Sequence, residues 1–258
     1  MRMLGWKPGS PASPLWACWG ERGTSLARIV ACGLKRVNCM GSIECAGVLF
    51  DLDGVLVDST PGVTRVWRGW AIEHGYDPAE IVKLAHGRRA IETVELVAPH
   101  LDSAVELLEL ERRELDDTDG LVVFEGAARL LAALPPDRWT VVTSGTRRLA
   151  TKRLRLAGLP VPEKLVSADE VRLGKPDPAP FLRGAELLCL NPRDCVAVED
   201  APSGVEAAHH AGMTAFAIPT TYARSELSHA DVLLERLDQL QAASIHAGGG
   251  ETRILLRW

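Results

Sequence analysis

From Cys45 onward, the chain alternates short apolar runs of β-strand type with amphipathic stretches of helical period. This alternation is typical of an α/β fold in which helices connect the strands of a parallel sheet and cover its faces. With 258 residues, 47% of them hydrophobic, the chain is long enough for one large core domain and a smaller insert. The candidate strands are residues 46–51, 139–143, 165–167, 195–199, 214–218 and 231–233.

A long interval separates the first two candidate strands. Within it the apolar residues recur at helical spacing, as at Val63, Val66, Trp67 and Trp70. The interval is too long for a simple crossover, and an insert is tolerated because the entropy of loop closure grows slowly with length. We therefore expect a helical cap at residues 60–122, beside a core domain made of residues 45–59 and 123–240.

Both ends of the chain depart from this pattern. Residues 1–40 carry six Lys or Arg against one acid, with several prolines and glycines and no clear period. Residues 1–44 are therefore expected to be a poorly ordered N-terminal extension, either upstream of a natural start at Met40 or serving as an organelle-targeting peptide. Residues 241–258 are interpreted as a C-terminal tail, with a flexible joint at Gly248 to Gly250.

Charge and composition exclude several functional classes. The formal net charge of -5 gives no electrostatic reason to bind nucleic acid, and no apolar run reaches the roughly 18 to 20 residues that span a bilayer. The six cysteines form no C-x-x-C pair and have no histidine at zinc-ligand spacing, so neither a disulfide framework nor a zinc site is indicated. We expect a cytoplasmic enzyme, monomeric or weakly dimeric, without nucleic acid or membrane partners.

Acidic pairs end two of the candidate strands. Asp51 and Asp53 follow the first strand, and Glu199 and Asp200 end the fourth. Ligands of open α/β sheets bind beyond the carboxyl ends of the strands, so these carboxylates are expected to meet at one edge. Each close pair would cost roughly 4 kcal/mol at an effective dielectric near 20 unless a cation lay between them. All-oxygen ligation with open positions favours Mg²⁺, whereas the alternative for the first pair is a polar strand end with a turn at Gly54.

Two further segments suit a phosphate group. Thr143, Ser144 and Gly145 follow the second candidate strand and lead into a helical stretch. A hydroxyl and free backbone N–H groups at such a turn can bind an anion, although an ordinary helix N-cap is the alternative. Lys175 lies in a Gly-Lys-Pro loop, where it is expected to neutralise phosphate charge unless it is a solvated surface lysine.

Four motifs together carry a family resemblance. Asp51-x-Asp53-Gly54, Thr143-Ser144-Gly145, Lys175-Pro176 and Glu199-Asp200 resemble, in this order, the four motifs of the haloacid dehalogenase superfamily of phosphohydrolases. The resemblance covers roughly residues 45–240. It implies a Rossmann-like three-layer core with a parallel sheet and a small α-helical cap inserted after the first strand, which agrees with the helical interval.

The resemblance also implies a role for each motif residue. Asp51 would be the nucleophile that forms a phosphoaspartate, and Asp53 would protonate the leaving alcohol and then activate water. Thr143 would hold the phosphoryl oxygens together with the backbone near Ser144 and Gly145. Lys175 would offset the charge of the phosphate and of Asp51.

The metal ligands follow from the same resemblance. Mg²⁺ would be bound by the side chains of Asp51 and Asp200 and by the backbone carbonyl of Asp53. Glu199 would lie in the second shell or serve as an occasional direct ligand.

A segment of the cap bears on the substrate. Residues 85–93 resemble the cap of sugar and polyol phosphatases that act on 2-deoxyglucose 6-phosphate, glycerol phosphate and similar small esters. There, His86 and Arg88 would reach substrate hydroxyls or phosphate, unless this basic stretch is simply solvated. The resemblance thus implies an Mg²⁺-dependent sugar or polyol phosphatase.

Three alternatives remain open. A phosphomutase of the β-phosphoglucomutase type shares the core motifs, but such mutases carry a histidine in the first cap helix where Val63 stands here. A dehalogenase would need neither Asp53 nor a metal-binding acidic pair. A binding protein with a decayed site is disfavoured by the intact set of acids.

Overall fold

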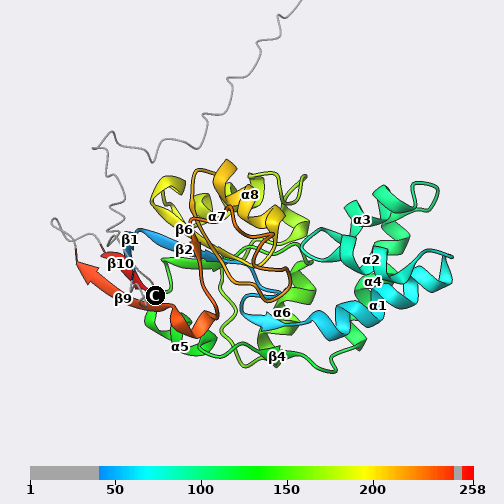
Figure 1. Ribbon diagram of the computed structural model, residues 1–258, viewed down its shortest axis with the longest axis horizontal. Helices are drawn as coiled ribbons and strands as arrows, with labels where there is room; N and C mark the ends of the chain where they lie inside the picture. Colours follow the sequence, from blue (N-terminus) through cyan, green and yellow to red (C-terminus); the bar gives the residue numbers. More distant parts are fainter. Residues whose placement is uncertain (1–40, 247–251) are drawn as a thin grey trace, which may run out of the picture.

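The computed structural model describes residues 41–246 and 252–258 (Figure 1). The expectations for residues 1–40 and for the joint at Gly248 to Gly250 lie outside the described residues. Among the residues that are described, no helix has both the length and the apolarity needed to cross a membrane.

A five-stranded parallel sheet forms the centre of the molecule, which confirms the predicted α/β fold. Its strands are β2 (Gly47–Phe50), β5 (Trp139–Val141), β6 (Cys195–Glu199), β7 (Thr214–Ala217) and β8 (Val232–Leu233), in the order β5-β2-β6-β7-β8. The strands β2, β5 and β6 are buried throughout. Continuous apolar runs are typical of parallel strands that are covered on both faces.

The expected strand at residues 165–167 is wrong. This segment makes a single isolated bridge, between Val142 and Val166, before a short 3-10 helix begins at Ala168–Glu170. The amide of Ala168 donates to the carbonyl of Gly145, so the chain turns across the end of β5 after one residue of pairing.

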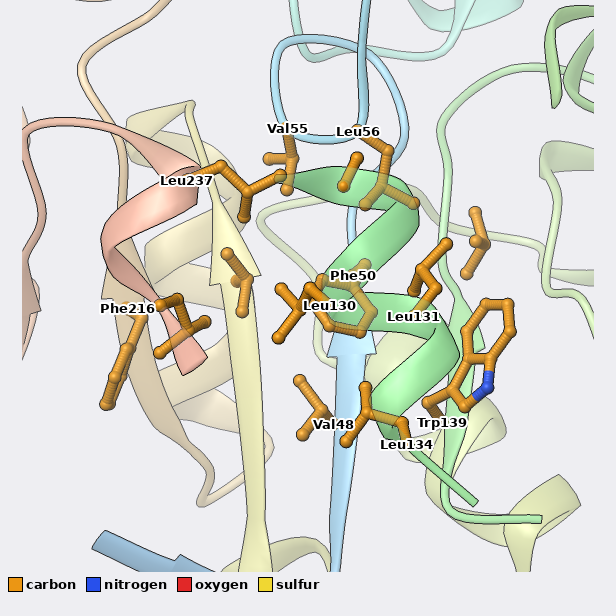
Figure 2. Close-up of a cluster of buried hydrophobic side chains, with 14 of the residues drawn as sticks. Val48, Phe50, Val55, Leu56, Leu130, Leu131, Leu134, Trp139, Phe216 and Leu237 are labelled. Atoms are coloured by element: carbon orange, nitrogen blue, oxygen red, sulfur yellow. The ribbon is translucent and has the colours of Figure 1, made fainter. Parts of the chain in front are cut away.

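Helices cover both faces of the sheet. Two of them, α5 (Ala127–Ala133) and α6 (Arg147–Leu156), pack on one face, and α7 (Ala179–Leu188) and α8 (Pro202–His210) pack on the other. The alternation of β2 produces these two layers, because Val48 and Phe50 point to one face and Leu49 to the other. Figure 2 shows Leu130 and Leu131 of α5, with Leu134 directly after the helix, packed against Val48, Phe50 and Trp139.

A helical cap is inserted between β2 and α5. It contains α1 (Thr60–Glu73), α2 (Pro78–Ala85), α3 (Ala90–Val97) and α4 (Ser103–Asp116), within the range expected for the cap. The short antiparallel strands β3 (Val57–Asp58) and β4 (Val122–Val123) pair where the chain leaves and re-enters the core. The cap has a hydrophobic cluster of its own around Trp67 and Trp70.

A second sheet corrects the expectation for both chain ends. The strands β1 (Ser42–Cys45), β10 (Thr252–Arg257) and β9 (Gln241–His246) pair antiparallel in this order, at the opposite end of the molecule from the cap (Figure 1). Ile43, Ile254 and Leu256 join the core cluster on the α5 side of the main sheet. Residues 42–44 are therefore a strand and not part of an extension. The described parts of 241–258 belong to the core domain, because β10 buries alternate apolar residues there and β9 pairs with it.

Two further 3-10 helices complete the described chain. They span Pro192–Asp194 and Leu237–Gln239. The first leads into β6, and the second lies between β8 and β9.

Candidate functional site

Three acidic side chains meet at the carboxyl ends of two adjacent strands. Asp51 directly follows β2, Glu199 is the last residue of β6, and Asp200 follows it. Because β2 and β6 are parallel and paired in register, the two ends lie side by side. Carboxylate oxygens of Asp51, Glu199 and Asp200 lie within 4.8 Å of one another, whereas Asp53, which the sequence places in the same group, is not among them.

Lys175 is inserted into this acidic group. Its Nζ lies 2.6 Å from Oδ1 of Asp51 and 2.5 Å from Oε1 of Glu199, and it donates to the carbonyl of Val142 at 3.0 Å. The lysine is 3% exposed, so the alternative of a solvated surface lysine is wrong. Its side chain extends from the loop before α7 to the strand ends, where it contacts both Asp51 and Glu199.

Burial and mutual repulsion shift the ionisation of these groups. Burial raises the pKa of Asp51 to about 7, against the opposing charge of Lys175. Burial, with the charges of Asp51 and Glu199, also raises the pKa of Asp200. Burial by itself would lower the pKa of Lys175, but the two carboxylates beside it raise the value. Three carboxylates around one ammonium leave an excess of negative charge that a bound cation would offset.

The donor set fits Mg²⁺. Asp51, Glu199 and Asp200 supply carboxylate oxygens, and no histidine or cysteine of the described residues joins the cluster. Hard oxygen ligands that leave positions for water and phosphate are typical of magnesium sites and not of structural zinc sites.

Two glycines allow these carboxylates to lie close to the backbone. Gly54 has a φ of 85°, and a Cβ at this position would lie 1.9 Å from Oδ2 of Asp200. A Cβ on Gly204, in the first turn of α8, would lie 2.0 Å from Cδ of Glu199. Any larger residue at either position would displace an acidic side chain of the site.

Asp53 lies beside this cluster but is not one of its three carboxylates. Its Oδ1 accepts a hydrogen bond from Oγ of Ser59 at 2.6 Å and lies 3.0 Å from Nη1 of Arg153. Arg153 in turn donates to Oε2 of Glu114, at 2.7 Å. Asp53 therefore holds a position that is distinct from the three clustered carboxylates, and it lines the cleft that the cap also lines.

The sequence left two roles open for the turn after β5, namely anion binding and capping of the following helix. The N-cap of α6 is Thr146, whose hydroxyl accepts from the amide of Leu149 at 3.2 Å. Thr143 is buried two residues after β5, and its Oγ1 accepts from the amide of Gly145 at 3.1 Å. The hydroxyl of Ser144 donates to the carbonyl of Gly87 in the cap. Thr143 is therefore not the helix cap, and the alternative of an ordinary N-cap applies to Thr146 instead.

A cleft of about 250 Å³ lies between the core and the cap. The core side is formed by Asp51, Asp53, the 143–146 turn and Asp200. The cap side presents both apolar and polar groups, namely Val63, Trp67, Leu107, Leu110, His86, Arg88, Glu111 and Glu114. The nucleophile candidate and its neighbouring acid thus open into one enclosed space that accommodates a small ester.

His86 and Arg88 both line this cleft, at the end of α2 and just after it. The carbonyl of His86 accepts from Oη of Tyr222 at 3.1 Å, and burial lowers the pKa of the imidazole. The structure places both side chains beside the cleft, and their contact with substrate stays a prediction.

A cap contact next to Lys175 was not expected from the sequence. Arg89 donates to the carbonyls of Arg172 and Ala168, at 2.9 and 3.2 Å. Glu92 accepts from the amide of Gly174 at 2.8 Å. The N-terminal turn of α3 therefore holds the loop that presents Lys175.

Arg153 and Glu114 are further site residues that motif reading does not reveal. Both lie outside the four motifs, on α6 and α4. A signal exists for Arg153, because Leu149, Ala150 and Leu154 place it on the buried face of α6. An arginine at an apolar helical position needs a buried partner, which is the reason to look for an acid opposite it.

Comparison with known proteins places the chain among related sequences. A family model described as haloacid dehalogenase-like hydrolase matches residues 45–212. Hexitol phosphatase A of Escherichia coli (strain K12) is 41% identical over 77% of this chain and 94% of its own length. Glycerol-1-phosphate phosphohydrolase 1 of Saccharomyces cerevisiae is 31% identical over 83% of this chain and 91% of its own length.

Solved structures show the same fold. The β-phosphoglucomutase of Clostridium difficile superposes with a TM-score of 0.67, covering 76% of this chain and 93% of its own. Its sequence identity is 21%, so the likeness concerns the fold alone.

Proposed function

The chain belongs to the haloacid dehalogenase-like hydrolases, and from this premise we propose that it is a magnesium-dependent phosphatase of small sugar or polyol phosphate monoesters. The observation that carries the proposal is the placement of Asp51. Its carboxylate contacts Lys175 at 2.6 Å, lies in the acidic cluster and opens into the same cleft as Asp53.

The first chemical step uses Asp51 as nucleophile. One of its oxygens forms a bond to phosphorus while the bond between phosphorus and the ester oxygen breaks, which leaves a phosphoaspartate and an alkoxide. The alkoxide takes a proton from Asp53 and leaves as a neutral alcohol. Thr143 and the backbone N–H of Ser144 hold the phosphoryl oxygens at the turn before α6, where Gly145 keeps Thr143 in place through its own amide.

The second step returns the enzyme to its starting state. Asp53, now a carboxylate, takes a proton from a water molecule as the water oxygen bonds to phosphorus. The bond between phosphorus and Asp51 breaks, which releases inorganic phosphate and restores the aspartate. Lys175 keeps Asp51 oriented and offsets its charge through both steps.

Mg²⁺ is the metal that the donor set favours. Asp51, Asp200 and the backbone carbonyl of Asp53 would hold it, and Glu199 adds charge beside Lys175. When bound, the ion neutralises the clustered carboxylates and the phosphate oxygens.

The substrate class follows from the relatives and from the cleft. Two relatives are named for hexitol and glycerol phosphates, and both match this chain over most of its length. The cap side combines the Trp67 ring with the polar groups of His86, Arg88 and Glu111. An aromatic surface with several hydrogen-bonding groups is suited to a polyhydroxylated leaving group.

The phosphomutase alternative is less supported. The position at which such mutases carry a histidine is Val63, which lines the cleft with an aliphatic side chain. Valine has no proton to exchange with a bound sugar. The solved mutase shares the fold at an identity too low to transfer its activity.

The expected cytoplasmic location remains part of the proposal. Cys45, Cys189 and Cys195 are free thiols, as a reducing compartment requires. The monomeric or weakly dimeric state stays a prediction that light scattering of the purified protein checks.

Phosphate release across a panel of hexose, pentose, hexitol and glycerol phosphates tests the function. With Mg²⁺ present, release is expected from several of these esters, and the Asp51→Asn variant serves as the blank. The panel includes β-glucose 1-phosphate, because its conversion to the 6-phosphate with little free phosphate would support the mutase instead. Release from none of these esters contradicts the proposed substrate class.

A further inference from the structure

A buried arginine connects the proposed acid to the cap. Arg153 of α6 is 8% exposed, with Nη1 3.0 Å from Asp53 and Nη2 2.7 Å from Glu114. Asp53 belongs to the core, on the loop after β2, whereas Glu114 belongs to α4 of the cap. One guanidinium therefore bridges a catalytic carboxylate and a carboxylate from another part of the fold.

The bridge belongs to a longer seam between α4 and α6. Thr146 donates its hydroxyl hydrogen bond to Glu111 at 2.5 Å, and Lys152 donates to the carbonyl of Leu115. Glu111 lies about one turn before Glu114 and Leu115 on α4, so α4 contacts α6 along one face. Within this seam, the Arg153 contact is the one that continues to a reacting group.

Packing alone does not require an arginine at this position. The neighbouring buried residues of α6 are Leu149, Ala150 and Leu154, and an aliphatic residue would complete the same face. Replacing a buried ion pair by apolar residues of similar size is often neutral or stabilising. A guanidinium at this position is thus explained better by what it orients than by stability.

The two oxygens of Asp53 have different surroundings. Both the Ser59 hydroxyl and the Arg153 guanidinium contact Oδ1. None of the hydrogen bonds formed within residues 41–246 and 252–258 engages Oδ2. An oxygen that accepts the Ser59 hydrogen bond and faces the positive guanidinium at 3.0 Å is the less favourable place for a proton, so a protonated Asp53 carries its proton on Oδ2.

We infer that Arg153 is a positioning residue for the acid and base, which anchors Oδ1 of Asp53 to Glu114 of the cap and so reserves Oδ2 for proton exchange with the leaving group and the attacking water. The inference rests on the proposed function, because it assigns an atom to the role of Asp53 in that reaction. Ser59 and Arg153 fix the carboxylate plane, and Glu114 fixes the guanidinium.

An aryl phosphate separates this role from a structural one. Nitrophenolate leaves without a proton, so the first step with p-nitrophenyl phosphate does not need Asp53 as an acid, whereas hydrolysis of the phosphoaspartate still needs it as a base. In Arg153→Met, the rapid first release of nitrophenolate is expected to stay within about threefold of wild type in rate, at full amplitude. The steady-state rate that follows is expected to fall at least about tenfold.

Three variants control this comparison. Arg155→Met removes an exposed arginine of the same helix and is expected to leave both phases unchanged. Arg153→Lys keeps the positive charge but loses the planar guanidinium that contacts two carboxylates at once. Its steady-state rate is therefore expected to lie between those of the wild type and Arg153→Met. The double variant Arg153→Met with Glu114→Gln leaves no unpaired buried charge, and a folded double variant with the same loss excludes misfolding as the cause.

The outcomes are distinct. An unchanged steady-state rate in Arg153→Met, or an equal fall in both phases of the folded double variant, would overturn the inference. The ratio of the two phases is measured on the aryl phosphate alone. A wild-type enzyme that shows both phases but releases no phosphate from sugar or polyol esters would therefore contradict only the substrate class.

Discussion

Gly204 occupies the point where α8 comes closest to the acidic group. A methyl group there would lie 2.0 Å from Cδ of Glu199, which also binds Lys175. Gly204→Ala is therefore expected to displace Glu199, to cost about 1–3 kcal/mol of stability through overpacking, and to raise the Mg²⁺ concentration needed for activity. Urea denaturation and the Mg²⁺ dependence of phosphate release measure the two effects.

Gly69 offers a matched control for that substitution. It is also a helical glycine, in α1 of the cap, and a Cβ there would meet no atom within 4 Å. Gly69→Ala is expected to stabilise the protein by about 0.5–1 kcal/mol without changing the Mg²⁺ dependence. The same stability and Mg²⁺ dependence in both variants would contradict the close packing described for Glu199.

Some residues of the site could be predicted from the sequence and others could not. Asp51, Glu199 and Asp200 were predictable because each follows or ends a continuous apolar run, and the ends of parallel strands meet at one edge. The sequence places Arg153 on the buried face of α6, but its role at the site was not predictable, since nothing in a helical sequence says which acid of another element will contact it. The partner, Glu114, lies 39 residues away in the chain.

The small sheet of β1, β10 and β9 stabilises the end of the core farthest from the cap. Ile254 is fully buried in β10, whereas its neighbour Leu255 is only partly buried. Ile254→Ala is expected to cost about 2–5 kcal/mol of stability, because it removes buried methyl groups and leaves a cavity. Thermal unfolding checks this, with a smaller loss expected for Leu255→Ala.

Turnover per folded molecule should not change in either variant, since this sheet lies at the opposite end of the molecule from the cap (Figure 1) and none of its residues lines the cleft. Equal losses of stability in the two variants would show that Ile254 does not belong to the core. A specific loss of turnover in Ile254→Ala would show that the small sheet is coupled to the site.

Helices and strands were predictable to different degrees. The longer apolar runs gave β2, β6 and β7 almost to the residue, and the helical period gave the cap. The small sheet was missed because β1 pairs with β10 across roughly the whole described chain, and long-range antiparallel pairing leaves no local signal. The segment at 165–167 was overpredicted because apolar character does not reveal that its backbone turns toward Gly145.

Across the molecule as a whole, the acidic cluster makes stability depend on pH and metal. The folded pKa of Asp51 is raised by burial to about 7, from 3.8. The folded state thus binds an additional proton between these values, and the metal-free protein loses stability as the pH rises through that window. Mg²⁺ replaces the proton, so it is expected to stabilise the protein more at about pH 7.5 than at about pH 5.5.

The Asp51→Asn variant removes this contribution together with the part of the raised pKa of Asp200 that the charge of Asp51 causes. Burial lowers the pKa of His86, so this histidine makes the protein more stable as the pH rises, opposite to the effect of Asp51. His86 is present in both proteins, so its effect cancels in the comparison. In EDTA, raising the pH from about 5.5 to about 7.5 is expected to lower the melting temperature of the wild type relative to that of the variant. Parallel pH profiles of the two proteins would contradict the raised pKa.

The cap and the core form one catalytic unit in this structure. The core reaches the cap through Ser144 and Arg153, and the cap reaches the core through Arg89. These contacts surround the cleft, so Asp53, the 143–146 turn and the loop that carries Lys175 are each held partly by the cap. Exclusion of water by such a lid strengthens the electrostatic interactions within the site.

The covalent state of Asp51 during turnover tests the mechanism most directly. Enzyme mixed with a radiolabelled sugar or polyol phosphate and Mg²⁺ is quenched in acid, and the labelled peptide is identified by mass spectrometry. The mechanism predicts a hydroxylamine-sensitive label on the peptide that contains Asp51, and its absence from Asp51→Asn. Label on another residue, or full turnover by Asp51→Asn, would contradict it.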